Sequence, residues 1–177
     1  MRNLFLIAIV VLGLSSCSKN YTPYSSYLPE RNNWSQSEIE RIQFYTSEDI
    51  VLYREISDSE TEIINGKIKM ENGREVDEVI IKEGTPGVAV WIAEDQRYGI
   101  SFDDSDEMFL TFGPNPERKK RYYLMAGKWQ GKTGVVNYQG QEYKTSAKSA
   151  SAYLMVDLKS IKKVDRNSHV AKGRTID

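Results

Sequence analysis

The sequence predicts an all-β fold, a small antiparallel barrel or sandwich of about ten short strands with one short N-terminal helix. Apolar residues alternate with a period of two along most of the chain, and turn-forming residues separate these segments at close spacing. The chain also contains 11 tyrosines and 3 tryptophans, which favour sheet structure. The connections are too short to contain crossover helices, so the strands are expected to be antiparallel.

The first residues have the features of a secretory signal. Arg2 supplies a positive charge, and the apolar run 4–14 is too short to cross a hydrocarbon core of about 30 Å as a helix. The tetrad Leu14-Ser15-Ser16-Cys17 then resembles the lipobox of bacterial lipoproteins, with Cys17 in the place of the lipidated cysteine. The alternative is that Cys17 is an incidental thiol.

The resemblance implies that residues 1–16 are a signal peptide and that the mature chain begins at a lipid-modified Cys17. Several acyl chains would hold the protein firmly on a membrane, because each buried methylene contributes about 0.8 kcal/mol. The following residues, 18–20, lack the acidic run of some surface-exported lipoproteins. The expected location is therefore a bacterial cell envelope, facing the periplasm.

Residues 17–34 are expected to be the lipidated N-terminus and a spacer, because Pro23 and Pro29 discourage helix formation. A single β domain is expected over residues 35–177. It begins with Ser35-Gln36-Ser37-Glu38, a capping-box pattern that predicts a short helix ending near Gln43.

The strands are predicted from their turns. A polar turn at 47–49 predicts a hairpin between Phe44 and the segment 50–56. Asn72-Gly73 is typical of a type I′ hairpin turn. In Gly84-Thr85-Pro86-Gly87, Pro86 presets φ and Gly87 is expected to supply the left-handed conformation.

The clearest alternation predicts a meander of consecutive strands, 98–103, 108–113 and 121–126, after a strand in which Val88, Val90 and Ile92 share a face. A further hairpin is expected from 133–138 and 141–145, followed by a flexible loop at 146–151 and a basic tail. The predicted core comprises Ile50, Leu52, Ile81, Val90, Ile92, Ile100, Phe102, Leu110, Phe112, Leu124, Leu154 and Val156.

Composition disfavours most catalysis. Cys17 is the only cysteine and His169 the only histidine, so the mature domain offers neither a usual zinc site nor a thiol nucleophile. The formal net charge is -1, which gives no reason to expect a nucleic-acid partner. No cofactor is predicted.

Two charged segments flank the second meander strand. The acidic cluster Asp103, Asp104, Asp106 and Glu107 is a weak metal candidate, although its spacing differs from a helix-loop-helix calcium loop and favours a solvated turn. The basic run Arg118-Lys119-Lys120-Arg121 is a candidate contact for an anion or an acidic partner, with a soluble loop as the alternative. Consecutive antiparallel strands would place the two segments at opposite ends of the sheet.

The tryptophans admit carbohydrate binding. Trp91 falls opposite Val90 and Ile92 in the alternation, and Trp129 lies between glycines, so both are candidates to stack on a sugar; Trp34 is a third. The alternative for all of them is cross-strand packing.

These features favour a non-enzymatic cell-envelope lipoprotein whose β domain binds or scaffolds a protein or glycan partner. One alternative is an envelope glycan hydrolase that uses unlocated carboxylates, and another is a carbohydrate-binding module. A cleft with two close carboxylates would favour the hydrolase. A flat row of exposed rings would favour the binding module, and one apolar patch would favour a protein partner.

Overall fold

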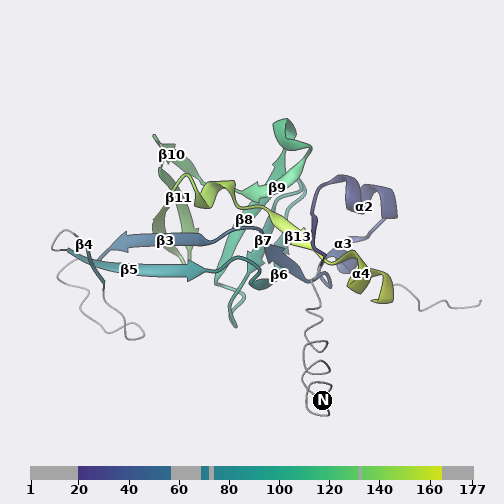
Figure 1. Cartoon of the computed structure of the whole chain (residues 1–177), viewed down its shortest axis with the longest axis horizontal. Helices are drawn as coiled ribbons and strands as arrows, with labels where there is room; N and C mark the ends of the chain where they lie inside the picture. Colours follow the sequence, from purple (N-terminus) through teal and green to yellow (C-terminus); the bar gives the residue numbers. More distant parts are fainter. Residues whose placement is uncertain (1–19, 57–68, 72–73, 132, 165–177) are drawn as a thin grey trace, which may run out of the picture.

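The computed structural model describes residues 20–56, 69–71, 74–131 and 133–164, which form a mostly β protein (Figure 1). Its strands make two antiparallel sheets, one 7-stranded and one 6-stranded. The predicted all-β class is confirmed, and neither sheet closes on itself within the described residues. The elements are β1 (Thr22–Pro23), α2 (Tyr27–Asn32), α3 (Gln36–Ile39), β2 (Phe44–Thr46), β3 (Ile50–Glu55), β4 (Lys69–Glu71), β5 (Arg74–Ile81), β6 (Pro86–Ile92), β7 (Tyr98–Ser101), β8 (Phe109–Asn115), the 3₁₀ turn η2 (Pro116–Arg118), β9 (Arg121–Leu124), β10 (Lys128–Gln130), β11 (Thr133–Tyr138), β12 (Gln141–Thr145), the 3₁₀ turn η3 (Ser149–Ser151), β13 (Leu154–Val156) and α4 (Leu158–Val164).

The larger sheet has the strand order β1-β13-β2-β6-β7-β8-β9. Its second half, β6 to β9, is the predicted meander, because each strand pairs antiparallel with the next. The smaller sheet has the order β10-β11-β12-β3-β5-β4 and contains two of the three predicted hairpins. In one of them β4 pairs with β5, with Glu71 opposite Arg74. Gln139 and Gly140 connect β11 to β12 with φ of 54° and 72°, as a type I′ turn requires.

The predicted hairpin around residues 47–49 is wrong. β2 pairs with β13 and β6 in the larger sheet, whereas β3 pairs with β12 and β5 in the smaller one. The chain therefore crosses between the sheets at this turn. Phe44 and Ile50 on its two sides are both fully buried, and they enter the common core from different sheets.

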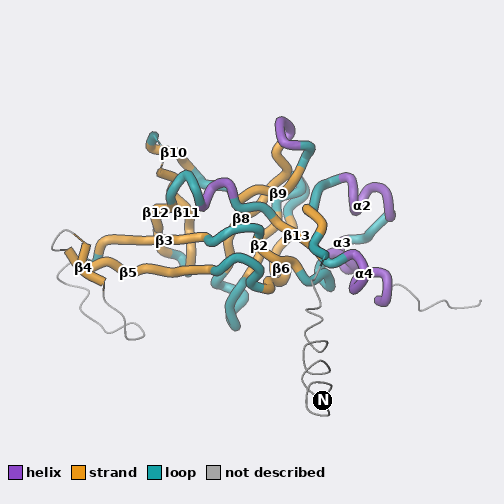
Figure 2. Tube along the Cα trace, viewed as in Figure 1, coloured by secondary structure: helices purple, strands orange, loops and turns teal. Residues whose placement is uncertain are grey.

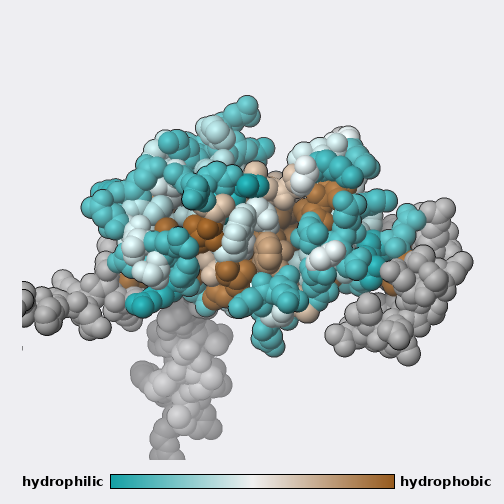
Figure 3. Space-filling view, turned by 180° about the vertical axis from the view of Figure 1, so that it is seen from behind, coloured by the Kyte–Doolittle hydropathy of each residue, from teal (hydrophilic) through white to brown (hydrophobic). Residues whose placement is uncertain are grey.

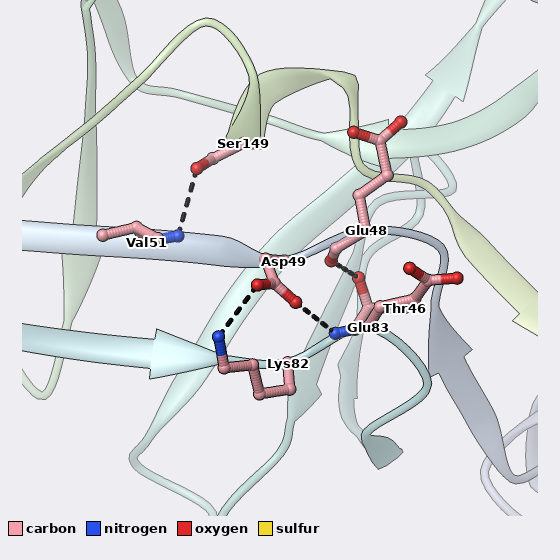
Figure 4. Close-up of polar contacts among 7 residues, drawn as sticks. All are labelled: Thr46, Glu48, Asp49, Val51, Lys82, Glu83 and Ser149. Carbon is pink, nitrogen blue, oxygen red and sulfur yellow. Dashed lines mark hydrogen bonds and ion pairs between the residues drawn. The ribbon is translucent and has the colours of Figure 1, made fainter.

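A second crossing, from β5 to β6, lies beside the first (Figure 4). The Asp49 carboxylate accepts a hydrogen bond from the Glu83 backbone N–H at 2.8 Å and one from Lys82 Nζ at 3.0 Å. The Gly84 N–H also donates to the Thr46 carbonyl at 2.8 Å. Gly84 has φ +75°, so this residue rather than Gly87 provides the left-handed conformation, and Gly87 lies within β6. The two crossings therefore support each other.

A third crossing, from β12 to β13, joins the same junction. The Val51 N–H donates to Ser149 Oγ at 3.0 Å (Figure 4). Thr145 Oγ1 donates to the Val51 carbonyl at 3.0 Å. Ser149 is 1% exposed, so the segment 146–151, predicted as a flexible loop, is an ordered part of the junction. The Ser149 hydroxyl accepts the hydrogen bond of the Val51 N–H, which lies beyond the end of the β12–β3 pairing and has no strand partner there.

Three α-helices, α2, α3 and α4, occur in the described residues rather than one, and Figure 2 also colours the two 3₁₀ turns as helix. The predicted helix is α3, where the Glu38 carboxylate accepts hydrogen bonds from Ser35 N and Ser35 Oγ, both at 2.6 Å, and it ends at Ile39 rather than Gln43. α2 lies in the segment predicted as spacer. Pro29 does not prevent this helix, because it occupies the first turn, where no backbone donor is required. α4 begins at Leu158 and continues into the predicted basic tail, which starts at Lys159.

The segment predicted as spacer is part of the fold. β1 pairs with β13, and its Pro23 lies on an edge strand, where a missing donor is tolerated. Tyr24 is fully buried, and its ring packs edge-on against Phe44 and Tyr122. The N-terminal residues of the described chain thus complete the core.

One core joins both sheets. Of the predicted core residues, Val90, Ile92 and Phe102 are partly buried and the other members are buried. The predicted alternation fails in β6, where the register shifts between Ala89 and Trp91. Because of this β-bulge, Ala89 faces the core and Val88 is 43% exposed.

Candidate ligand-binding face

Aromatic side chains lie on the outer face of the meander. Trp91 is 41% exposed, and its ring centroid is 6.3 Å from that of Phe109. Leu110, the neighbour of Phe109 in β8, is fully buried, so Phe109 points to the opposite face. Gly99 on β7 lies beneath it, since a Cβ built there would be 2.8 Å from Phe109 Cδ2. Glycine at this position lets the ring lie close to the sheet.

The same arrangement recurs one strand further on. Met125 is 40% exposed, and a Cβ built on Gly113 would collide with its sulfur. Arg97 lies next to it, with Cγ 3.5 Å from the same position, and its guanidinium is 6.0 Å from the Trp91 ring centroid. Arg97 therefore connects the Trp91 end of the face to Met125.

Trp129 continues this row on the smaller sheet. It is 49% exposed on β10 and pairs with Gly134 on β11. A Cβ on Gly134 would be 3.0 Å from the indole Cζ3, so this glycine also makes room for a ring. We call Trp91, Arg97, Phe109, Met125 and Trp129 the ring face. Hydrophobic residues gather across the middle of the molecule when it is seen from behind (Figure 3).

A groove of about 790 Å³ lies at the Trp129 end of this face. Met125 and Trp129 line it together with Tyr123 and Arg118, the first residue of the predicted basic run. Small residues form much of the remaining wall, and among the described lining residues Glu117 alone has a carboxylate. This volume is typical of a ligand-binding cleft. We call it the Trp129 groove.

The basic run is held over aromatic rings. The Arg118 guanidinium lies 5.0 Å from the Tyr123 ring centroid, and that of Arg121 lies 5.5 Å from the Tyr153 centroid. Lys120 Nζ is 5.2 Å from the Tyr27 ring. Such contacts orient the cations while leaving their outer sides available to an anion. Within the run, Lys119 has φ 56° and Lys120 has φ 51°, which turns the chain from η2 into β9.

The acidic cluster forms the turn between β7 and β8. Ser101 Oγ donates to the carbonyl groups of Asp103 at 3.1 Å and Ser105 at 2.9 Å, which fixes the loop from within. In the described part of the chain, no three acidic, histidine or cysteine side chains are placed to hold a metal ion. Because β7, β8 and β9 are consecutive antiparallel strands, this turn and the basic run lie at opposite ends of β8, as predicted.

The structure thus brings Trp129 and Arg118 into one groove and places Trp91 at the other end of the same face. Sequence reasoning missed Met125, which lies within the predicted strand 121–126 and just beyond the end of β9. Glycines 99, 113 and 134, each within an apolar segment, are the signal that a side chain packs flat over the strand. Cys17 and His169 lie outside the described residues.

No family model, curated protein or solved structure matches this chain. Among the described helices, none has both the length and the apolar character needed to span a membrane.

Proposed function

We propose that this protein is a cell-envelope glycan-binding lipoprotein, and that the ring face binds a glycan with acidic groups. The observation that supports this function is that Trp129 and Arg118 line the same groove. An exposed indole offers a flat apolar surface for a sugar ring. A guanidinium suits carboxylate and phosphate groups, to which it can donate two parallel hydrogen bonds.

The rest of the face extends the argument beyond a single subsite. Trp91 and Phe109 provide further ring surface, and Arg97 provides a second guanidinium between them and the groove. A ligand that alternates apolar ring faces with negative groups matches this order of side chains. A free small anion would use the arginines and leave the rings uncovered.

Binding is better supported than hydrolysis. Glycosidic-bond cleavage generally uses two carboxyl groups about 5–9.5 Å apart. The residues that line the Trp129 groove include one carboxylate, that of Glu117. The exposed rings also match the feature that distinguishes a binding module from a hydrolase.

The envelope location is proposed from Leu14-Ser15-Ser16-Cys17 alone. In the organism that makes the protein, the lipid on Cys17 would hold the β domain at a membrane. Fractionation tests this part separately: the parent should enter the detergent phase and Cys17→Ala should not. A Cys17→Ala variant that still partitions with the membrane would contradict the anchor.

Titration with soluble polysaccharides tests the glycan function. The parent should bind a uronic-acid polymer more tightly than a neutral polymer of similar length, and Trp129→Ala should weaken binding about tenfold or more, a loss of about 1.4 kcal/mol. Ile80→Ala is a matched control, because Ile80 is 46% exposed on β5, which three strands of the same sheet separate from β10. Equal binding by parent and Trp129→Ala would refute the proposal.

A further inference from the structure

A second cavity, of about 510 Å³, lies between the N-terminal helices and the meander. Trp34 and Ile39 from the helical segment line one part of it, and Ile92 and Tyr98 line the part contributed by the sheet. It is separate from the Trp129 groove: the two share no lining residue, and consecutive residues Tyr122 and Tyr123 of β9 point into different cavities.

Two buried hydroxyl groups of this cavity have no hydrogen-bond partner among the described residues, those of Ser26 and Tyr122. Ser26 is 2% exposed and Tyr122 is 0% exposed. Leaving a buried hydroxyl unpaired costs about 1–3 kcal/mol, so two in one cavity need an explanation. A ligand that exchanges hydrogen bonds with both would provide one.

The neighbouring tyrosines show why the protein does not satisfy these groups itself. The hydroxyl groups of Tyr24 and Tyr98 are 3.3 Å apart and hydrogen-bond each other. The Tyr122 ring packs against both, with centroids 4.9 Å and 4.6 Å away, yet its own hydroxyl is left out of that pair. Ser26 precedes α2 without capping the helix through its side chain.

The remaining lining residues define the ligand class. Among the described residues that line it, none is a lysine, arginine or histidine, and Glu30 is the only ionisable group apart from the tyrosines. An anion would therefore meet a negative charge without compensation from these residues. Trp34 offers a ring face, and the polar wall consists of hydroxyl and carboxamide groups, which both donate and accept hydrogen bonds. The carboxamides belong to Asn33, Gln36 and Gln96.

We infer that this cavity binds a neutral polyhydroxylated ring, as in an uncharged sugar residue, with Ser26 and Tyr122 as hydrogen-bonding partners and Trp34 as the apolar wall. The ring is either a free sugar or the end of a longer glycan, since both present the same hydroxyl groups. This inference does not depend on the Trp129 groove.

The test uses the full chain in detergent and a panel of neutral hexoses and N-acetylhexosamines, with the matching uronic acids. At least one neutral sugar should bind with a Kd of about 1 mM or tighter and raise the Tm, and its uronic acid should bind more weakly. Binding should also change the tryptophan fluorescence through Trp34, and Trp34→Phe should remove this change. Oligosaccharides that carry the same sugar at their reducing end distinguish a free sugar from the end of a glycan. Tighter binding of the oligosaccharide identifies a glycan end, and equal binding identifies a free sugar.

Variants separate a binding role from a merely structural one. Ser26→Ala and Tyr122→Phe should each lower the affinity about tenfold while leaving the Tm of the free protein equal or higher, because each removes an unpaired buried hydroxyl. Tyr138→Phe, at a buried tyrosine outside this cavity, should bind the neutral sugar as the parent does. The inference is overturned if no neutral sugar binds, if uronic acids bind equally well, or if Ser26→Ala and Tyr122→Phe match the parent in affinity.

Discussion

Asp49 accepts a hydrogen bond from the backbone N–H of Glu83 at 2.8 Å, and this contact joins two of the places where the chain passes from one sheet to the other, β2 to β3 and β5 to β6. Lys82 adds an ion pair to the same carboxylate at 3.0 Å. The Glu83 N–H, together with Lys82, lowers the pKa of the Asp49 carboxyl below its ordinary value. The ionisation of this one side chain therefore affects the contact that joins the two crossings.

The first prediction follows from that pKa. A carboxyl with a lowered pKa in the folded state stabilises the fold above its unfolded pKa of about 3.9, and this stabilisation is lost as pH falls through the folded value. We expect Asp49→Asn to lower the free energy of unfolding at neutral pH and to reduce its decline at acid pH. Urea denaturation across the acid range measures both. Asp104→Asn, at an exposed position in the turn before β8, is the control, and an identical pH profile for Asp49→Asn and the parent would contradict the prediction.

The second prediction concerns the core and the bulge in β6. Ile100 and Leu110 are fully buried and pair across β7 and β8, so truncating either to alanine should cost about 2–5 kcal/mol. Val88, which the uninterrupted alternation would bury, is 43% exposed, and Val88→Ala should change stability by about 0.5 kcal/mol or less. Chemical denaturation compares the three variants. A cost for Val88→Ala equal to that of Ile100→Ala would mean that the bulge is absent.

Turn residues in the sequence predicted strand pairing correctly where the pairing depends on neighbouring residues alone. The predicted hairpins of β4 with β5 and of β11 with β12 are correct, because a short connection restricts which residues of the two strands can pair. The hairpin predicted around residues 47–49 is wrong, because the polar residues that suit a hairpin equally suit a crossing between sheets. Only the partners of β2 and β3, which come from distant segments, distinguish the two.

For the ring face too, the sequence indicated single residues but not which of them lie together. Trp129 and Arg118 were separate candidates in the sequence, and their meeting depends on the passage of the chain from β9 in one sheet to β10 in the other. The cavity with Ser26 and Tyr122 was not predictable, because the segment 17–34 was expected to be a spacer. Its two prolines occupy the positions that tolerate them, an edge strand and the first turn of a helix, and residue type alone does not reveal this.

The third prediction tests the glycines beneath the ring face. In Gly99→Ala, the new methyl group would lie 2.8 Å from Phe109 Cδ2, so the ring must lift from the sheet, at a cost of about 1–3 kcal/mol. In Gly113→Ala, the colliding atom is the sulfur of the flexible Met125 side chain, which can move toward solvent at a smaller cost. Gly99→Ala should also weaken polysaccharide binding more than Gly113→Ala does. Equal effects of the two variants on stability and binding would contradict the prediction.

The fourth prediction is a loss of stability at alkaline pH. Burial raises the pKa of Tyr138 to about 12, and burial raises the pKa of Tyr24 and Tyr122 as well. A raised folded pKa means that the stabilisation is complete below the unfolded value of about 10 and is lost as pH rises above it. Phenolate absorbance should therefore increase together with unfolding for these rings. Ionisation of every tyrosine at about pH 10 in the still-folded protein would contradict the prediction.

The last prediction concerns the basic run and its distance from the acidic turn. The two segments lie at opposite ends of β8, a strand of 7 residues that spans roughly 20 Å. Exposed charges this far apart are largely screened at physiological salt, where the Debye length is about 8 Å. The cations therefore do not pair with the acidic turn and remain available to a negatively charged glycan.

Replacing Arg118, Lys119, Lys120 and Arg121 together with glutamine should weaken binding of the uronic-acid polymer and flatten its dependence on salt, while binding of a neutral polymer changes little. Because three of these cations lie over tyrosine rings, the variant should also lose about 1–3 kcal/mol of stability in total. Titrations at several salt concentrations, at a temperature where both proteins are folded, separate the two effects. Converting Asp103, Asp104, Asp106 and Glu107 to amides is the control of opposite sign, and it should leave binding unchanged or stronger. If the basic-run variant binds the acidic polymer as the parent does at every salt concentration, these cations do not contact the ligand, and the anionic part of the proposed specificity fails.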